Sequence, residues 1–173
     1  MDTFECITTK FEVREFSQQD VPSDIRLKIL EAARLTGTGM NTQHWRFILI
    51  DKKEKLKRLA DDSTSGSWVG GANFAIIILT NPKYGFHMID AGRVLQNMQL
   101  AAWNYGVGSG LFTGIKLGQL ESDFGIPNEP SPTVIAGFGY PARKLMGKRK
   151  NRLSLHELVY YEKYGNPIGN SIG

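Results

Sequence analysis

The sequence predicts a single domain of the α+β class, in which helices cover one sheet. The stretch Phe74–Thr80 is apolar along its whole length, and strands of this kind lie in the middle of a helix-covered sheet. Asp90–Tyr105 places apolar residues over a broad helical stripe that Gly106 ends. The 173 residues suit one domain, and 41% hydrophobic with 22% charged residues excludes a disordered or coiled-coil chain.

Two helices are expected in the first forty residues. A short helix follows Asp2 or Thr3 as its N-cap, because apolar residues recur there at helical spacing. A second helix opens at Pro22 and stops at Gly37. The residues that define one face of each helix are Phe4, Ile7 and Phe11 in the first, and Ile25, Ile29, Ala32 and Ala33 in the second.

Strands and helices alternate through the rest of the domain. Trp45–Asp51 is expected to be a strand, and Lys52–Asp62 an amphipathic helix with leucines on one side and lysines on the other. Ser109–Gly114 and Thr133–Tyr140 are expected as further strands, with a short helix Leu117–Phe124 between them.

The C-terminal region contains a helix start and a tail. Ser154 and Glu157 form a capping box, since the hydroxyl and the carboxylate can each bind an amide N–H at the helix start. Residues 165–173 have nothing local to pack against, so they either fray or lie on a partner chain.

Charge and composition narrow the classes of function. The net charge of +4 is a mild excess that suits either nucleic acid or a small anion. Lys148–Arg152 has no interleaved aromatic residue and no nucleic-acid motif nearby, so nucleic acid is not expected as a partner. No apolar run approaches the ~20 residues of a membrane span, and the acids Asp2 and Glu5 do not suit a signal peptide. A cytoplasmic protein is therefore expected.

Several common catalytic motifs are absent from the sequence. Gly106–Gly110 invites comparison with a dinucleotide fingerprint, but it follows a helix and its third glycine is misplaced. There is no Walker A loop, no Gly-x-Ser-x-Gly elbow and no Cys-x-x-Cys, since Cys6 is alone. The three histidines are widely separated, so no metal site is expected.

Three segments rich in basic or hydrogen-bonding residues stand apart from the periodic elements: Lys10–Arg14, Thr36–Trp45 and Lys148–Arg152. Each has an ordinary explanation when taken alone. The first can be a solvated face and the third a solvated tail. The second can be a helix stop before a strand, because Gly and Asn are usual turn residues.

Taken in order, these segments resemble the nitroreductase family of FMN-dependent oxidoreductases over nearly the whole chain. Lys10–Phe16 matches a basic Arg-Arg-Ser-x-Arg-x-Phe stretch at its first, fifth and seventh places. Gly37–Trp45 is similar to the family loop Pro-Ser-x-x-Asn-x-Gln-Pro-Trp. Three later pieces are also similar. The first is Asp90–Gly114, in which a helix with an acid at its head is followed by a Gly-x-Gly turn and a strand. The other two are the Gly-Tyr-Pro of Gly139–Pro141 and the Lys-x-Arg of Lys150–Arg152.

The resemblance implies a fold and an assembly. It implies a three-layer α/β/α sandwich of the α+β class, with a mixed, mainly antiparallel sheet, built from residues 1–173 as one FMN-binding domain. It also implies a homodimer with two FMN sites at the subunit interface. Residues 165–173 would then pack on the partner subunit. The helix stripe around Met98 and Ala102 is expected to be partly uncovered in a monomer.

The resemblance further assigns residues to FMN. Lys10, Lys150 and Arg152 suit the phosphate, because ammonium and guanidinium groups bind a dianion. Arg14 would face N1 and O2, where a cation stabilises the reduced flavin. Thr38–Asn41 would reach the partner's site, and Thr113-Gly114 would offer a backbone N–H to N5. The full set is Lys10, Phe11, Glu12, Arg14, Thr38, Gly39, Asn41, Gln43, Thr113, Gly114, Lys150 and Arg152.

Some positions depart from the family pattern. Phe11 stands at the second basic place, and Glu12 stands where a small hydroxyl is usual. Glu12 is expected to accept a hydrogen bond from a ribityl hydroxyl or from flavin N3–H, and to offset part of the charge of Arg14. His44 replaces the usual proline and is expected only to pack beside Trp45.

The implied reaction is ping-pong hydride transfer from NAD(P)H through flavin N5 to a nitroaromatic, quinone or similar acceptor, with no catalytic side chain. The chain is short for the family and leaves little room for lid helices, so an open, poorly selective site is expected. The alternatives are a flavin-binding or storage protein without turnover, a divergent member that acts as a dehalogenase or modifies flavin, and a protein without flavin.

Overall fold

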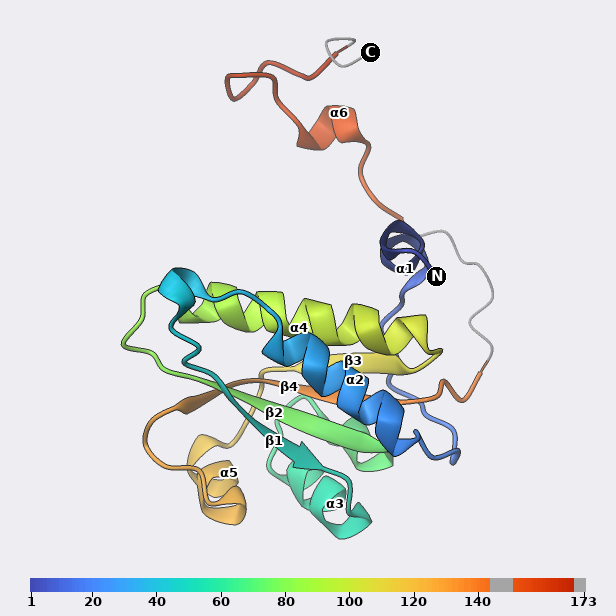
Figure 1. Ribbon diagram of the computed structural model, residues 1–173, viewed down its shortest axis with the longest axis vertical. Helices are drawn as coiled ribbons and strands as arrows, with labels where there is room; N and C mark the ends of the chain where they lie inside the picture. Colours follow the sequence, from blue (N-terminus) through green and yellow to red (C-terminus); the bar gives the residue numbers. More distant parts are fainter. Residues whose placement is uncertain (144–150, 170–173) are drawn as a thin grey trace.

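A computed structural model describes residues 1–143 and 151–169 of the chain (Figure 1). Four strands form one sheet in the order β1-β2-β4-β3, and every neighbouring pair is antiparallel. The strands are β1 (Arg46–Ile50), β2 (Phe74–Thr80), β3 (Gly108–Phe112) and β4 (Ser131–Gly139). An isolated parallel bridge joins Glu12 to Ser109 of β3, so the N-terminal segment adds the parallel component of a mixed sheet.

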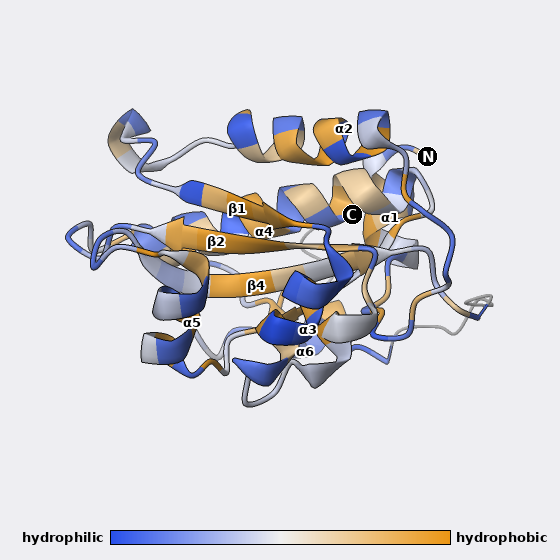
Figure 2. Ribbon diagram, turned by 90° about the horizontal axis from the view of Figure 1, so that it is seen from below, coloured by the Kyte–Doolittle hydropathy of each residue, from blue (hydrophilic) through white to orange (hydrophobic). Residues whose placement is uncertain are grey.

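Helices cover both faces of the sheet. Helices α2 (Ser23–Arg34) and α4 (His87–Asn104) cover one face. The other face carries α3 (Lys53–Asp61), α5 (Leu117–Phe124) and the 3₁₀ turn η2 (Ser67–Gly71), which the sequence pattern does not predict. Figure 2 shows the apolar strands between these two layers. The expected three-layer sandwich of the α+β class is confirmed.

Each interlayer space holds its own hydrophobic core. On the α2 and α4 side, Phe74 stacks on Phe138 with ring centroids 4.9 Å apart. On the other side, Leu56 and Leu59 of α3 join Leu120 of α5. Burial of each such side chain contributes about 1.5–3 kcal/mol. All seven residues of β2 are buried, because both cores need an apolar strand between them.

The burial of α4 corrects one expectation. Met98 and Ala102 are both 0% exposed within a single chain, because the sheet and α2 cover them. The exposed apolar residues of α4 lie instead in its first turn, where Met88 and Ile89 are 57% and 67% exposed. The exposed apolar surface of α4 therefore lies at its N-terminal end.

The first helix, α1 (Thr3–Thr9), forms where it is expected but buries a different residue. The side chain of Asp2 caps it by accepting a hydrogen bond from the Glu5 N–H at 2.8 Å. Phe4 and Ile7 are 73% and 47% exposed, whereas Cys6 is buried. Neighbouring elements, which the local spacing cannot anticipate, determine which face of this helix is buried. Among the described helices, none is long and apolar enough to cross a membrane.

Residues 151–169 form an arm that projects away from the sandwich (Figure 1). Within it, α6 (Leu155–Leu158) begins at the expected capping box, where Glu157 accepts a hydrogen bond from the Ser154 N–H at 2.9 Å. Nearly every residue of the arm is exposed in the single chain, including Tyr164 at 86%. Residues 170–173 of the tail lie outside the described residues.

Candidate functional site

The segment of residues 10–17, called the strap below, runs in extended form beside the edge strand β3 and the end of β4. The Val13 N–H donates to the Ser109 carbonyl at 2.8 Å, and the Ser17 N–H donates to the Tyr140 carbonyl at 2.8 Å. A Cβ at Gly108 would lie 2.5 Å from the Val13 side chain. The strap therefore depends on glycine in β3 for its close approach.

The acidic residue of the strap is paired with its first cation. The Lys10 ammonium forms an ion pair with the Glu12 carboxylate, and the side chain of Lys10 is only 10% exposed. Gln99 of α4, itself 2% exposed, directs its Nε2 to Glu12 Oε1 at 3.5 Å. Glu12 thus pairs with Lys10, a partner that the sequence does not predict, and its expected effect on the charge of Arg14 stays a prediction.

Arg14 lies on the outer side of the strap against an aromatic ring. Its guanidinium carbon is 5.8 Å from the centroid of the Trp68 ring, and Phe16 packs on the same ring at 6.2 Å. No carboxylate pairs with Arg14 within the described ranges 1–143 and 151–169. Its positive charge is therefore held in place by stacking and remains available to an anionic group.

Two buried polar atoms next to the strap lack hydrogen-bond partners among the described residues: Ser109 Oγ and Trp68 Nε1. Such atoms cost about 1–3 kcal/mol when left unsatisfied, and in native structures they commonly serve a ligand or water. A separate pocket on the strap is lined by residues 12–15 together with Pro141 and Arg143, and neither Ser109 nor Trp68 is part of its lining. Sequence reasoning missed Trp68 and Arg143, because neither belongs to a recognisable motif.

The loop that contains Thr38, Gly39, Asn41 and Gln43 lies elsewhere, at the first turn of α4. It contains the 3₁₀ turn η1 (Gly39–Asn41), in which Met40 and Asn41 have φ values of 51° and 53°. The Gln43 N–H donates to Thr38 Oγ1 at 3.0 Å and so closes the loop. Asn41 and Gln43 are exposed, and the Met40 side chain is 81% exposed. The loop therefore presents polar and apolar side chains to the outside of this chain.

His44 differs from its expected role. Its Nε2 lies 3.1 Å from Asp90 Oδ2, and both side chains are 2% exposed. It also packs on the Trp45 ring at a centroid distance of 6.2 Å, as expected. His44 therefore packs and also makes a buried polar contact to α4.

The remaining predicted residues are spread over three places. Thr113 and Gly114 follow the end of β3, where the Gly114 carbonyl accepts from the Thr64 N–H at 2.8 Å. A Cβ at Gly114 would lie 2.4 Å from Thr64 Oγ1, so this close approach requires glycine. Arg152 is exposed on the arm, and Lys150 lies outside the described residues. Phe11 is half-buried in the strap.

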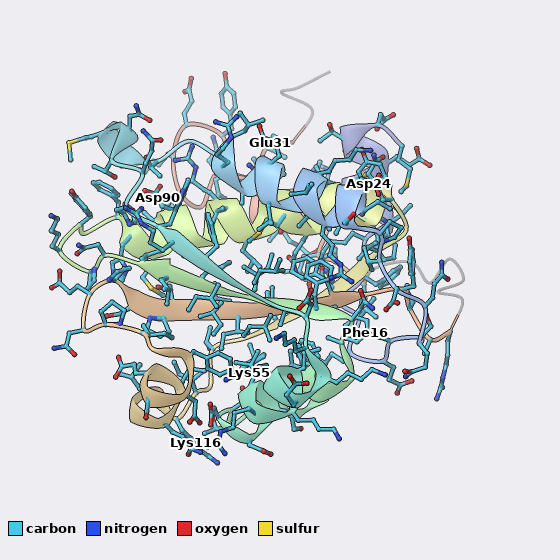
Figure 3. All side chains as sticks on the ribbon, turned by 60° about the horizontal axis from the view of Figure 1, so that its bottom comes forward. Phe16, Asp24, Glu31, Lys55, Asp90 and Lys116 are labelled. Atoms are coloured by element: carbon cyan, nitrogen blue, oxygen red, sulfur yellow. The ribbon has the colours of Figure 1, made fainter. Side chains whose placement is uncertain are left out.

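A single chain does not gather these residues into one site. The strap contacts Gln99 and the loop contacts Asp90, which are nine residues apart on α4 and hence roughly 13 Å apart along its axis. Figure 3 shows Phe16 and Asp90 at opposite ends of the sandwich. No group of three or more His, Cys, Asp or Glu side chains that could hold a metal ion occurs in the described part of the chain.

The sandwich, the strap on its glycine-containing edge strand and the polar loop at the head of α4 define an α+β domain that carries exposed and paired cations along one sheet edge. A model of the nitroreductase family matches residues 7–72 and 65–140, which is most of the chain. The chain therefore belongs to the nitroreductase family.

Individual relatives agree with this assignment. A protein of Methanothermobacter thermautotrophicus, provisionally named NADH dehydrogenase/NAD(P)H nitroreductase, is 29% identical over 151 residues, which cover 82% of this chain and 78% of the relative. A protein of Archaeoglobus fulgidus with the same name is 28% identical over 81% of this chain and 86% of its own length. The fold is also similar to that of an FMN-dependent nitroreductase from Clostridium difficile, with a TM-score of 0.85 at 23% identity over 93% of this chain and 99% of the other.

Proposed function

We propose that the protein is an FMN-dependent oxidoreductase that takes hydride from NAD(P)H. The observation that carries the proposal is the strap, which combines an available guanidinium at Arg14 with unpartnered buried polar atoms at Ser109 and Trp68. This donor set suits a ligand that is anionic and rich in hydroxyl groups. The relatives named NAD(P)H nitroreductase and the FMN-dependent structural neighbour support the same function.

The residues of the strap would have separate roles. Arg14, oriented by Trp68, supplies positive charge to the pyrimidine edge of the cofactor. Lys10 and Arg152 supply cations for the phosphate, with Lys10 moderated by Glu12. FMN, when bound, supplies hydride acceptance and donation at its N5 position. The side chains bind and orient, and none acts as a nucleophile.

We further propose a homodimer in which each site is shared between subunits. The strap meets α4 at Gln99 and the loop with Thr38 and Asn41 meets it at Asp90, so two chains side by side can bring one strap and one loop together. Surfaces suited to a partner are exposed, including Met40, Met88 and the arm of residues 151–169. Large exposed apolar surfaces of this kind normally mark interfaces.

The reaction class that best suits this site is ping-pong reduction of a nitroaromatic, quinone or similar acceptor. The relatives named NAD(P)H nitroreductase support this reaction class.

The absorbance spectrum of the purified protein and chromatography of the released cofactor test the cofactor proposal. Bound FMN supports it, and bound FAD or a colourless protein that cannot be reconstituted contradicts it. Anaerobic stopped-flow mixing with NADH and with NADPH then tests turnover. Loss of flavin absorbance on a catalytic timescale is the expected result, whereas a stable oxidised spectrum would indicate a flavin-binding protein without turnover.

A further inference from the structure

We propose that Asp90 and His44 are positioning residues that hold the loop of residues 38–43 in the shape that completes the flavin site of a partner subunit. This inference rests on the proposed function and deepens it, because it names residues that act on the cofactor only through the loop. It also gives a role to His44 that the sequence pattern does not predict.

Asp90 is the centre of a buried hydrogen-bond network. Its Oδ2 accepts from the Gly39 N–H at 3.0 Å and lies 3.1 Å from His44 Nε2. Its Oδ1 accepts from Arg93 Nη1 at 3.3 Å. Asp90 is 1% exposed, and a buried carboxylate requires such donors to offset its loss of hydration. The loop backbone at Gly39 is thereby tied directly to the first turn of α4.

The direction of the His44–Asp90 hydrogen bond follows from a third partner. The Asn81 N–H donates to His44 Nδ1 at 3.2 Å, and a backbone N–H can only donate. His44 Nδ1 is therefore the acceptor, so Nε2 carries the hydrogen and donates to Asp90. The residue that follows β2 thus orients the imidazole, and the imidazole orients the carboxylate.

The loop needs such restraint because its backbone is unusual. Met40, Asn41 and Gln43 have φ values of 51°, 53° and 45°, a region that residues with a Cβ rarely adopt. Conformations of this kind persist only when surrounding structure enforces them, and they cluster at functional sites. Here the restraint comes from Asp90 and from Phe86, since a Cβ at Gly39 would lie 2.6 Å from the Phe86 ring.

The exposed side chains of the loop are the part that can reach a ligand. Among the described residues, the side chains of Asn41 and Gln43 make one hydrogen bond, from Gln43 Nε2 to the backbone carbonyl of Asn41 at 3.4 Å. The other side-chain polar atoms of the two residues make none within these residues. Asp90 and His44 are buried beneath the loop and cannot touch a ligand themselves. They are therefore positioning residues and not catalytic ones.

The test measures the dissociation constant of FMN by fluorescence titration of the intact protein, of three variants and of one control variant. Asp90→Asn removes the charge that holds both Gly39 and His44, and we expect the FMN Kd to rise about tenfold. His44→Leu should raise it as well, whereas His44→Gln, which keeps a donor at the position of Nε2, should restore most of the affinity. Asp24→Asn on α2, an exposed acid-to-amide change, is the matched control and should leave Kd unchanged.

A mixed dimer separates positioning of the partner's site from a general structural role. One chain carries Asp90→Asn and the other carries Lys10→Glu in its strap, and two affinity tags allow the mixed species to be purified. If each loop serves the partner, one of the two sites combines an intact strap with an intact loop, so half of the sites should bind FMN with the wild-type Kd. If each loop serves its own chain, no site is intact and this inference is wrong.

The outcomes also distinguish this inference from the proposed function. A wild-type protein that takes up no FMN overturns the proposed function and this inference with it. Wild-type binding together with an unchanged Kd in a folded Asp90→Asn dimer overturns the inference alone. If Asp90→Asn does not fold, the pair His44→Leu and His44→Gln decides, since equal wild-type affinity in both would also overturn it.

Discussion

The two cations of the strap have different surroundings, and this difference governs what each can do for a bound anion. Lys10 is nearly buried and paired with Glu12, which Gln99 supports from α4. Arg14 is exposed, stacks on Trp68 and has no carboxylate partner among the described residues. The strap therefore presents one attenuated and one free positive charge, and each can be tested by a single substitution.

Arg14→Met should lower the midpoint potential of the proposed flavin while leaving much of the binding intact. A cation near N1 stabilises the reduced cofactor, and loss of about 1 kcal/mol of this interaction corresponds to roughly 20 mV for a two-electron couple. Redox titration against a reference dye measures the shift, with Arg34→Met on the exposed face of α2 as a control away from the strap. An unchanged potential at full occupancy would place Arg14 away from the pyrimidine edge.

Glu12→Gln should tighten FMN binding. The substitution frees the Lys10 ammonium from its ion pair, and we expect the Kd to fall about three- to tenfold at low salt. The gain should shrink at high salt because screening weakens the attraction. Fluorescence titration at two ionic strengths measures this effect, and Glu15→Gln on the same strap is the control. Equal affinities of Glu12→Gln and wild type at low salt would show that Lys10 does not meet the phosphate.

At the scale of elements, a buried carboxylate without hydrogen-bond partners among the described residues lies where α3 and α5 meet. Asp62, which follows α3, is 0% exposed, and both of its carboxylate oxygens lack hydrogen-bond donors within residues 1–143 and 151–169. Burial, and next the nearby Asp123 carboxylate of α5, raise the pKa of Asp62 above its ordinary value. Arg58 pairs with Asp123 and opposes this shift in part.

Stability should therefore fall as pH rises through the range in which Asp62 ionises. The folded state binds the Asp62 proton more tightly than the unfolded state, so the unfolding free energy decreases with pH above the unfolded pKa of about 4. Asp62→Asn should remove this slope and stabilise the protein by about 1 kcal/mol at pH 7. Urea unfolding between pH 4 and pH 7.5, as approximate limits, measures both effects. The exposed acid in Asp24→Asn on α2 is the control, and equal slopes in Asp62→Asn and wild type would contradict the prediction.

At the scale of the whole molecule, a single chain leaves apolar side chains and a projecting arm exposed to solvent. The arm of residues 151–169 extends from the sandwich, and the exposed apolar side chains Met88 and Ile89 lie beside the loop that carries Met40. The two groups of candidate site residues meet α4 nine residues apart, at Asp90 and at Gln99. In the proposed homodimer, a second copy of the chain would cover these surfaces and bring a strap and a loop together.

Dilution should therefore reduce dimer and flavin occupancy together, because binding is linked to assembly. Light scattering with flavin absorbance across a dilution series measures the two quantities on one sample. A chain truncated after Tyr164 should dissociate at higher concentration than the full chain, since it loses part of the arm. A flavin-loaded monomer at any concentration would contradict the shared site and the cross-subunit role of Thr38 and Asn41.

Local sequence pattern was sufficient for most of the fold. The apolar run Phe74–Thr80 became β2 with the expected bounds, and the Leu117–Phe124 helix also formed as expected. These elements were predictable because each leaves a pattern in the sequence. A helix with one buried face has a periodic pattern, and a strand with two buried faces is a continuous apolar run. The motif at Lys10–Phe16 predicts a cofactor-binding segment from the sequence alone, and this assignment stays a prediction.

Partners between distant residues were decided only by the tertiary structure. His44 meets Asp90 across 46 positions, Glu12 meets Gln99 across 87, and Arg14 stacks on Trp68 from the unpredicted turn η2. Periodicity reports whether a side chain is buried, but not which charge or ring it will face there. That choice depends on how the sheet orders its strands and where the helices cross it, so the electrostatics of the strap and the restraint on the loop emerged only from the folded chain.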